Sequence, residues 1–255
     1  MYDASLFRLD DGVALITGAG AGIGRSIAKT FAAAGAKVTV TDRDSQAAEL
    51  VAQEISDSGG QATSVACDVT QECDLETSVK RTLEEFGKLT ILINNAGGGG
   101  PKPFEMPMSD MRFAYELNLF SLFHLCQLAA PQIEKAGGGA IVNISSMSGE
   151  NKNKRMASYG SSKAAVNHLT RNIAFDLGPK NIRVNAIAPG ATQTQALSTV
   201  LTPEIEQKML THTPLKRLGK PEDIANAALF LCSPASNWIS GQILTVSGGG
   251  FQELD

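Results

Sequence analysis

The chain has 255 residues, is 43% hydrophobic and carries a formal net charge of −4 at pH 7, which suits an α/β protein with a sizeable core and disfavours a nucleic-acid or anionic-membrane partner. Its four cysteines have neither metal-site spacing nor a disulfide framework, and they fit a reducing compartment. Since no signal-peptide pattern and no apolar run of transmembrane length is found, we expect a cytoplasmic protein that does not span a membrane.

A predicted strand, a glycine-rich loop, a helix and a second strand open the chain. The strands span Val13–Thr17 and Lys37–Thr41, and between them lie the loop Gly18–Gly24 and a helix over 25–34. Continuous apolar runs of this length are typical of strands that are buried on both faces of a parallel sheet. The order of these elements is the context that a dinucleotide-binding loop requires.

The glycines of this loop can serve separate purposes. Gly18 turns the chain, Gly22 lets the backbone approach a pyrophosphate, and Gly24 permits close packing of the helix on the strand. The start of the helix offers free N–H groups and a partial positive charge to phosphate. The spacing Gly-x3-Gly-x-Gly departs from the commoner Gly-x-Gly-x-x-Gly, so a purely structural turn is the alternative interpretation.

An acidic residue at the end of the second strand bears on the choice of cofactor. Asp42 follows the last glycine at close to the ~20-residue interval expected for the acid that binds the adenosine ribose. A carboxylate can accept hydrogen bonds from both ribose hydroxyls and repels a 2′-phosphate, so the sequence favours NAD over NADP. Arg43 is a complication, because a guanidinium here can partly tolerate that phosphate.

Strands and helices continue to alternate along the chain. Further strands are predicted over 62–67, 89–93, 140–144, 182–188 and 243–246, and further helices over 45–58, 72–86, 109–135, around 159–176 and from 221. Pro131 is expected to bend or stop the helix in which it lies. Seven apolar strands with helical crossovers predict a doubly wound Rossmann fold, with a seven-stranded parallel sheet and helices on both faces. Without a linker or repeat, residues 1–255 are expected to form a single domain.

A hydroxyl, a phenol and an ammonium group are grouped around the fifth strand. Tyr159 and Lys163 are four residues apart, so on a helix they share a face, and Ser146 follows the strand that ends at 144. A nearby cation lowers the pKa of a phenol from about 10 towards that of a useful base. A hydroxyl can donate to a substrate oxygen on which charge develops. The set suits proton exchange with a carbinol or carbonyl oxygen, whereas Tyr-x3-Lys alone can be a surface pair.

These residues together resemble the classical short-chain dehydrogenase/reductase family, along essentially the whole chain. The matching motifs occur in the family's order and are Thr17–Gly24, Asp68-Val69, Asn94–Gly97, Asn118, Ser146, Tyr159–Lys163 and Pro189-Gly190. Agreement of several weak motifs at consistent spacing is a stronger signal than any one of them.

The resemblance implies a role for each matching residue. Tyr159 would be the general acid/base, Ser146 would polarise the substrate oxygen, and Lys163 would bind the nicotinamide ribose and lower the pKa of Tyr159. Asn118 would hold a water that links the lysine to solvent, with a helix cap or a core amide as an equal alternative. The cofactor-binding residues would be Gly18, Gly22, Ile23, Gly24, Asp42, Arg43, Asp68, Val69, Asn95, Gly97, Tyr159, Lys163, Pro189, Gly190, Thr192 and Thr194. The three histidines show no metal-ligand pattern, and no metal is expected.

Several loops resemble, more narrowly, the bacterial hydroxysteroid dehydrogenases of this family. They are 94–104, 106–108, 150–154 and 247–254. The fold does not require particular residues in these loops. Similarity in them is therefore a better indication of the substrate than similarity in the cofactor motifs. The resemblance implies a steroid or bile-acid substrate, reversible oxidation of a 7α-hydroxyl to a 7-oxo group with NAD, and a homotetramer.

Several features keep two interpretations. The amphipathic segment 193–213 can cover a substrate, or it can pack on the sheet or on a neighbouring subunit; Gly97–Gly100 can give a bulky ligand room or be a flexible loop. The cationic cluster formed by Lys152, Lys154 and Arg155 can bind a carboxylate or be a solvated face. Trp238 is expected in the core or an interface.

Two other functions fit the residues less well. A 3-oxoacyl thioester reductase would normally use NADP, against which Asp42 argues, and would need a basic docking surface for its carrier protein. A non-catalytic NAD-binding or scaffold protein would usually have lost the catalytic side chains, yet Ser146, Tyr159 and Lys163 are all present.

Overall fold

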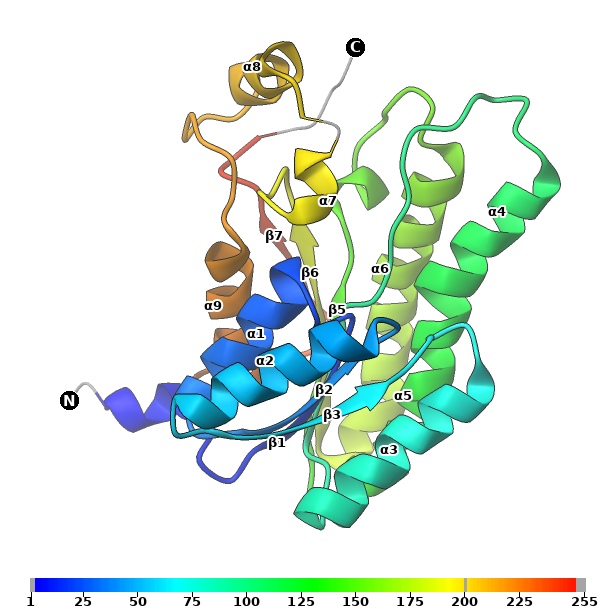
Figure 1. Cartoon of the computed structure of the whole chain (residues 1–255). Helices are drawn as coiled ribbons and strands as arrows, with labels where there is room; N and C mark the ends of the chain where they lie inside the picture. Colours follow the sequence, from blue (N-terminus) through cyan, green and yellow to red (C-terminus); the bar gives the residue numbers. More distant parts are fainter. Residues whose placement is uncertain (1–2, 200, 251–255) are drawn as a thin grey trace.

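A parallel sheet forms the centre of the computed structural model, which describes residues 3–199 and 201–250. Within these residues seven strands follow the order β3-β2-β1-β4-β5-β6-β7, and every neighbouring pair is parallel. The strands are β1 (Val13–Thr17), β2 (Lys37–Asp42), β3 (Gln61–Ala66), β4 (Ile91–Asn94), β5 (Gly139–Ile144), β6 (Ile182–Pro189) and β7 (Ile243–Val246). The predicted doubly wound fold is confirmed (Figure 1).

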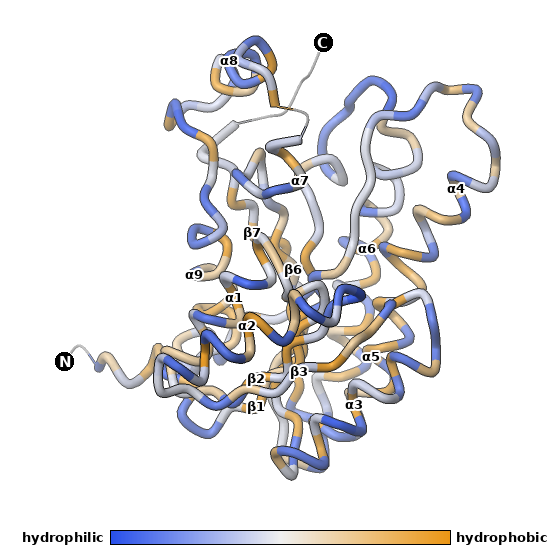
Figure 2. The backbone as a smooth tube through the Cα atoms, viewed as in Figure 1, coloured by the Kyte–Doolittle hydropathy of each residue, from blue (hydrophilic) through white to orange (hydrophobic). Residues whose placement is uncertain are grey.

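Helices cover both faces of the sheet (Figure 1). They are α1 (Gly22–Ala33), α2 (Ser45–Asp57), α3 (Glu72–Phe86), α4 (Met108–Tyr115), α5 (Ser121–Lys135), α6 (Ala157–Leu177), α7 (Gln195–Ser198), α8 (Pro203–Thr211) and α9 (Pro221–Cys232). Helices α1, α2 and α9 pack on one face, and α3, α5 and α6 on the other. Successive β1 residues serve opposite cores, because Ala14 and Ile16 join the first and Leu15 the second. Accordingly, hydrophobic colour gathers along the central strands in Figure 2.

The long helix predicted over 109–135 is divided, but not where its proline stands. A π-helical turn, Glu116–Phe120, separates α4 from α5, and the N–H of Ser121 donates to the carbonyl of Glu116. Pro131 lies inside α5, which continues to Lys135, so of the two expected effects, a bend or a stop, the stop is wrong. One missing N–H is tolerated there, whereas the π turn adds a residue that re-aims the side chains around it.

Smaller differences concern the ends and exposed parts of the chain. The helix predicted from residue 25 already begins at Gly22, so the loop's last glycines form its first turn. Trp238 is 100% exposed, and the expectation of a core position is therefore wrong. Val200 and the tail residues 251–255 lie outside the described residues. Among the described helices, none is long and apolar enough to cross a membrane.

Candidate active site

A cleft of about 800 Å³ lies at the carboxyl ends of the central strands. The strand order reverses between β1 and β4, so the loops that follow these strands diverge, and open α/β sheets bind ligands at such a point. The predicted site residues that line the cleft are Gly18, Gly22, Ile23, Asp42, Arg43, Asp68, Val69, Asn95, Gly97, Ser146, Tyr159, Lys163, Pro189, Gly190, Thr192 and Thr194. Two others, Gly24 and Asn118, are buried beside it rather than lining it.

The glycine-rich loop is packed too tightly to accept side chains. Gly18 and Gly22 have φ of 60° and 55°, in the left-handed region that favours glycine. A Cβ on Gly24 would lie 2.3 Å from the carbonyl oxygen of Gly18. The Asn95 amide donates to that same oxygen at 2.9 Å and fixes the loop on the end of β4. Gly22 and Ile23, in the first turn of α1, line the cleft, and the N–H groups at the start of a helix suit a pyrophosphate.

Two carboxylates stand where the adenosine half of a dinucleotide would lie. Asp42 Oδ2 accepts the N–H of Gly20 at 2.9 Å, which holds this carboxylate beside the glycine loop. Asp68 accepts the backbone N–H and hydroxyl of Thr70 at 3.0 and 2.8 Å. These two hydrogen bonds hold the pKa of Asp68 below its ordinary range, with a smaller contribution from Arg43. The cleft thus offers acceptors for ribose hydroxyls and a tight cradle for phosphate, so the residues present fit NAD.

The predicted catalytic side chains converge on the middle of the cleft. Ser146 follows β5, and its Oγ accepts the N–H of Ser148 at 3.1 Å, which sets the direction of the hydroxyl. Tyr159 and Lys163 share one face of α6, and the lysine Nζ lies 5.9 Å from the centre of the tyrosine ring. Nζ also donates to the carbonyl oxygen of Ile144 at 2.8 Å. The structure therefore brings together a hydroxyl, a phenol and an ammonium group.

The pKa of Tyr159 is raised, whereas the sequence predicted that Lys163 would lower it. Burial raises the pKa of the phenol above its ordinary 10.0, and a hydrogen bond with Ser146 lowers it by less. Lys163 does not produce the expected lowering of this pKa: its ammonium group lies over the ring and donates to the carbonyl of Ile144. Burial also lowers the pKa of Lys163, to about 8. Burial is therefore the main cause of the pKa shift of both groups, and in each case it favours the neutral form.

Asn118 joins the loop Gly97–Gly100 to helix α6. The π turn directs its amide inward, where Oδ1 accepts the N–H of Gly98 at 2.9 Å. Its Nδ2 donates to the carbonyl of Gly98 at 3.0 Å and to Ser162 Oγ at 3.2 Å. These contacts are those of a core amide, the alternative that the sequence left open.

Gly99 is a site residue that sequence reasoning did not select. A Cβ on it would lie 2.5 Å from Cδ2 of Tyr159, so the loop backbone rests on the tyrosine ring. The available signal was the run Gly97–Gly100, which allowed either room for a ligand or flexibility. The structure adds a third use, support of the phenol.

The amphipathic segment 193–213 contributes α7 and α8 at the cleft end of the sheet (Figure 1). Thr194 caps α7, accepting the N–H of Leu197 at 3.2 Å, and both Thr194 and Gln195 line the cleft. None of the residues described for α8 is buried, so this helix does not pack on the sheet as an ordinary core element would.

Replacing Lys163 by Met is expected to change how stability depends on pH. Since burial lowers the lysine pKa from 10.5 to about 8, the unfolded chain binds a proton between these values that the folded chain lacks. The free energy of unfolding contributed by this residue therefore rises with pH across the interval, by about 1 kcal/mol per pH unit.

The free energy of unfolding in urea is measured for wild type and for Lys163→Met at several pH values, from below 8 up to 10.5. The value for wild type minus the value for the variant should rise with pH. The buried cysteines act in the opposite direction, because burial raises their pKa to about 12, but they are common to both proteins. A difference that stays constant or falls as pH rises would contradict the buried, proton-poor lysine.

Comparison with known proteins places this arrangement among enzymes. A family model described as Enoyl-(Acyl carrier protein) reductase matches residues 18–250. The chain is 64% identical, over 255 residues and 100% of both proteins, to the 7alpha-hydroxysteroid dehydrogenase of Escherichia coli (strain K12). A solved structure of 7alpha-hydroxysteroid dehydrogenase complexed with NADH and 7-oxo glycochenodeoxycholic acid is also 64% identical, with full coverage of both chains and a TM-score of 0.98. A 3-oxoacyl-(acyl-carrier-protein) reductase of Aquifex aeolicus is 37% identical over 249 residues, covering 96% of this chain and 99% of that protein.

Proposed function

Because the chain belongs to the short-chain dehydrogenase/reductase family, we propose that it is a NAD-dependent 7α-hydroxysteroid dehydrogenase. It oxidises the 7α-hydroxyl of bile acids such as cholate, chenodeoxycholate and their conjugates to a 7-oxo group, reversibly. The observation that carries this proposal is the full-length likeness to an enzyme whose solved structure holds NADH and a 7-oxo bile acid.

The cofactor, when bound, accepts a hydride from the carbon that bears the hydroxyl. On this proposal Asp42 holds the adenosine ribose, and the first turn of α1 with its glycine loop holds the pyrophosphate. The remaining contacts are supplied by Asp68 and Val69 at the adenine, Asn95 and Gly97 along the cleft, Lys163 at the nicotinamide ribose, and Pro189, Gly190, Thr192 and Thr194 at the carboxamide. Their common place along one cleft supports this assignment.

Tyr159 is the general acid/base of the proposed reaction. In oxidation its phenolate takes the proton of the 7α-hydroxyl, and in reduction its phenol returns that proton to the carbonyl oxygen. Ser146 donates to the same oxygen while charge develops on it. Lys163, whose Nζ is held by the carbonyl of Ile144, binds the nicotinamide ribose, and Asn118 joins the loop at Gly98 to α6 at Ser162. Burial favours the neutral phenol, which is the form that gives its proton to the carbonyl oxygen in the reductive direction.

The segment 193–213 covers the steroid in this proposal, and the protein is a cytoplasmic homotetramer of single-domain subunits spanning residues 1–255. Exposed aromatic side chains along the α4–α6 side support association, since they otherwise leave apolar surface in water. They include Phe120, Phe123 and Phe175, of which Phe175 is 85% exposed.

The main competitor is a 3-oxoacyl thioester reductase, and a reductase assay separates the two. Purified protein is given NADH or NADPH with either a 7-oxo bile acid or a 3-oxoacyl thioester. We expect turnover of the 7-oxo bile acid with NADH, because Asp42 accepts ribose hydroxyls and repels a 2′-phosphate. Preferred turnover of the thioester with NADPH would contradict both the substrate and the cofactor.

A further inference from the structure

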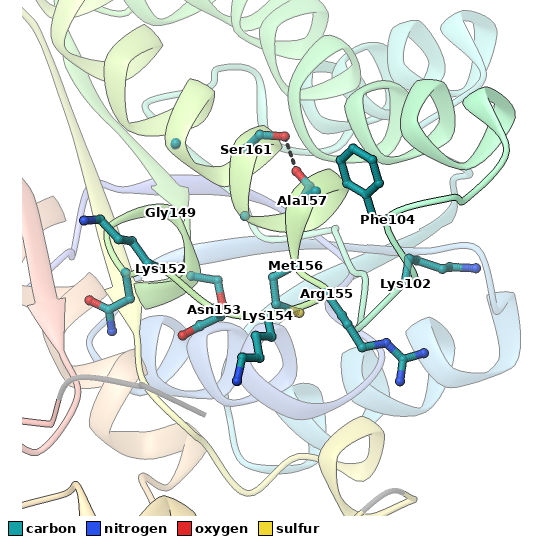
Figure 3. A pocket seen from close by; sticks show the side chains of 14 residues that line it. Lys102, Phe104, Gly149, Lys152, Asn153, Lys154, Arg155, Met156, Ala157 and Ser161 are labelled. Atoms are coloured by element: carbon teal, nitrogen blue, oxygen red, sulfur yellow. Dashed lines mark hydrogen bonds between the residues drawn. The ribbon is translucent and has the colours of Figure 1, made fainter. Parts of the chain in front are cut away.

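A second hollow, of about 580 Å³, lies beside the active-site cleft, and we call it the side pocket. It is formed by the loop between β5 and α6, by the first turns of α6 and by the chain around Lys102 and Phe104 (Figure 3). None of the proposed catalytic or cofactor-binding residues lines it. Its purpose is therefore not explained by proton transfer or by cofactor binding.

The charge of the side pocket is opposite to that of the protein. Four cationic residues line it, Lys102, Lys152, Lys154 and Arg155, and none of the described lining residues is acidic. The whole chain has a net charge of −4. Lys102 is paired with Asp110 at 3.1 Å outside the pocket lining, whereas Lys152 and Arg155 are exposed at its wall. A concentrated positive potential on an acidic protein attracts an anionic ligand.

The pocket wall also holds polar groups that need a partner. The Nδ2 atoms of Asn151 and Asn153 are buried without a hydrogen-bond partner among the described residues, and so is Oδ1 of Asn153. Buried polar groups are normally satisfied, and each of these two amide groups has two N–H donors, so polar groups of this loop can gain a partner when a ligand binds.

Arg155 occupies a backbone conformation that is unusual for its type. Its φ is 62°, in the left-handed region where glycine or asparagine is the ordinary choice. Its carbonyl oxygen accepts the N–H of Lys102 at 2.7 Å, which joins the two cationic segments of the wall.

The side pocket adjoins the active-site cleft. Lys102 lines both hollows, and the turn of α6 that presents Ser158 and Tyr159 to the cleft presents Ala157 and Gly160 to the side pocket. A ligand whose hydroxyl reaches Tyr159 can therefore extend its other end past Lys102.

Resting on the proposed function, we propose that the side pocket binds the anionic end of the bile-acid side chain. Arg155 and Lys152, the exposed cations of its wall, attract the carboxylate or sulfonate of a conjugate. The site thereby favours conjugated, negatively charged bile acids over neutral steroids with the same 7α-hydroxyl.

The test compares KM for glycochenodeoxycholate with KM for its methyl ester, which has the same steroid without the charge. In the wild type the ester is expected to have the higher KM. Arg155→Gln and Lys152→Gln should each reduce this ratio of KM values by up to about five-fold, and the double variant should bring it close to one. Added salt should reduce the wild-type ratio in the same direction.

Two further variants guard against indirect effects. Lys88→Gln removes an equal charge from an exposed residue between α3 and β4, at the opposite end of the sheet, and should keep the wild-type ratio. Arg155→Gly relieves the positive φ, so it should fold at least as well and still lose the preference.

An unchanged ratio in the double variant would overturn the side-pocket proposal, as would a rise in KM that is equal for acid and ester. Failure of the proposed function would look different, because neither the acid nor the ester would then be oxidised by any of these proteins.

Discussion

Tyr159→Phe is expected to reduce turnover of a 7α-hydroxy bile acid by about 10²- to 10⁴-fold, the range of a lost general acid/base. The substitution removes only the phenolic oxygen, which bonds to Ser146, and leaves the ring in place. The ring is what rests against Gly99 and lies below the Lys163 ammonium group. Folding and affinity for NADH should therefore change little, and the loss should fall on kcat.

The matched control is Tyr115→Phe. Tyr115 lies on α4, where its ring packs 6.3 Å from that of Phe120, outside the cleft lining. Steady-state kinetics and a fluorescence titration with NADH are measured for both variants. Retention of turnover within a few-fold of wild type by Tyr159→Phe would contradict the assignment of the proton transfer to this phenol.

Gly99→Ala is expected to lower kcat by about 10²-fold, the order of effect caused by a misplacement near 1 Å. The added methyl group would stand 2.5 Å from Cδ2 and 3.0 Å from Cβ of Tyr159, so the ring or the loop must shift. The residue also has a φ of 154°, at the edge of the region that side chains rarely adopt. A displaced phenol keeps its chemistry but loses its alignment with Ser146 and the substrate oxygen.

Gly100→Ala provides the control for this effect, because no described atom lies within 4 Å of a Cβ built there. Both variants receive the same kinetic assay, and Tm is measured to separate misplacement from unfolding. Equal kcat values for the two variants would show that the loop does not position the tyrosine.

The sheet and the glycine-rich loop are predictable because each is indicated by residues that are close together in the sequence. Apolar runs such as Val13–Thr17 are buried wherever they fall in a parallel sheet, and the positive φ of Gly18 and Gly22 needs glycine. The position of Asp42 is also visible in the sequence, because this residue directly follows the apolar run of β2. These features depend on residue type and spacing, which a sequence displays directly.

The π turn and the pKa of Tyr159 are not predictable in this way. Asn118 is set by hydrogen bonds to Gly98 and Ser162, which belong to two other segments, so a pattern over 109–135 cannot reveal it. The phenol's raised pKa depends on burial of the side chain and, in the opposite direction, on a hydrogen bond with Ser146. Tertiary packing decides such properties, and it also gives Gly99 its contact with the ring.

The most direct test of the proposed activity is the reduction of NAD by the purified protein with chenodeoxycholate and its 7β epimer ursodeoxycholate, side by side. The two substrates differ only in the configuration of the hydroxyl that must reach Tyr159 and Ser146. We expect turnover of the 7α compound alone, with loss of that turnover in Tyr159→Phe. No turnover of either epimer would contradict a bile-acid 7α-hydroxysteroid dehydrogenase, and turnover of both would contradict the proposed stereochemistry.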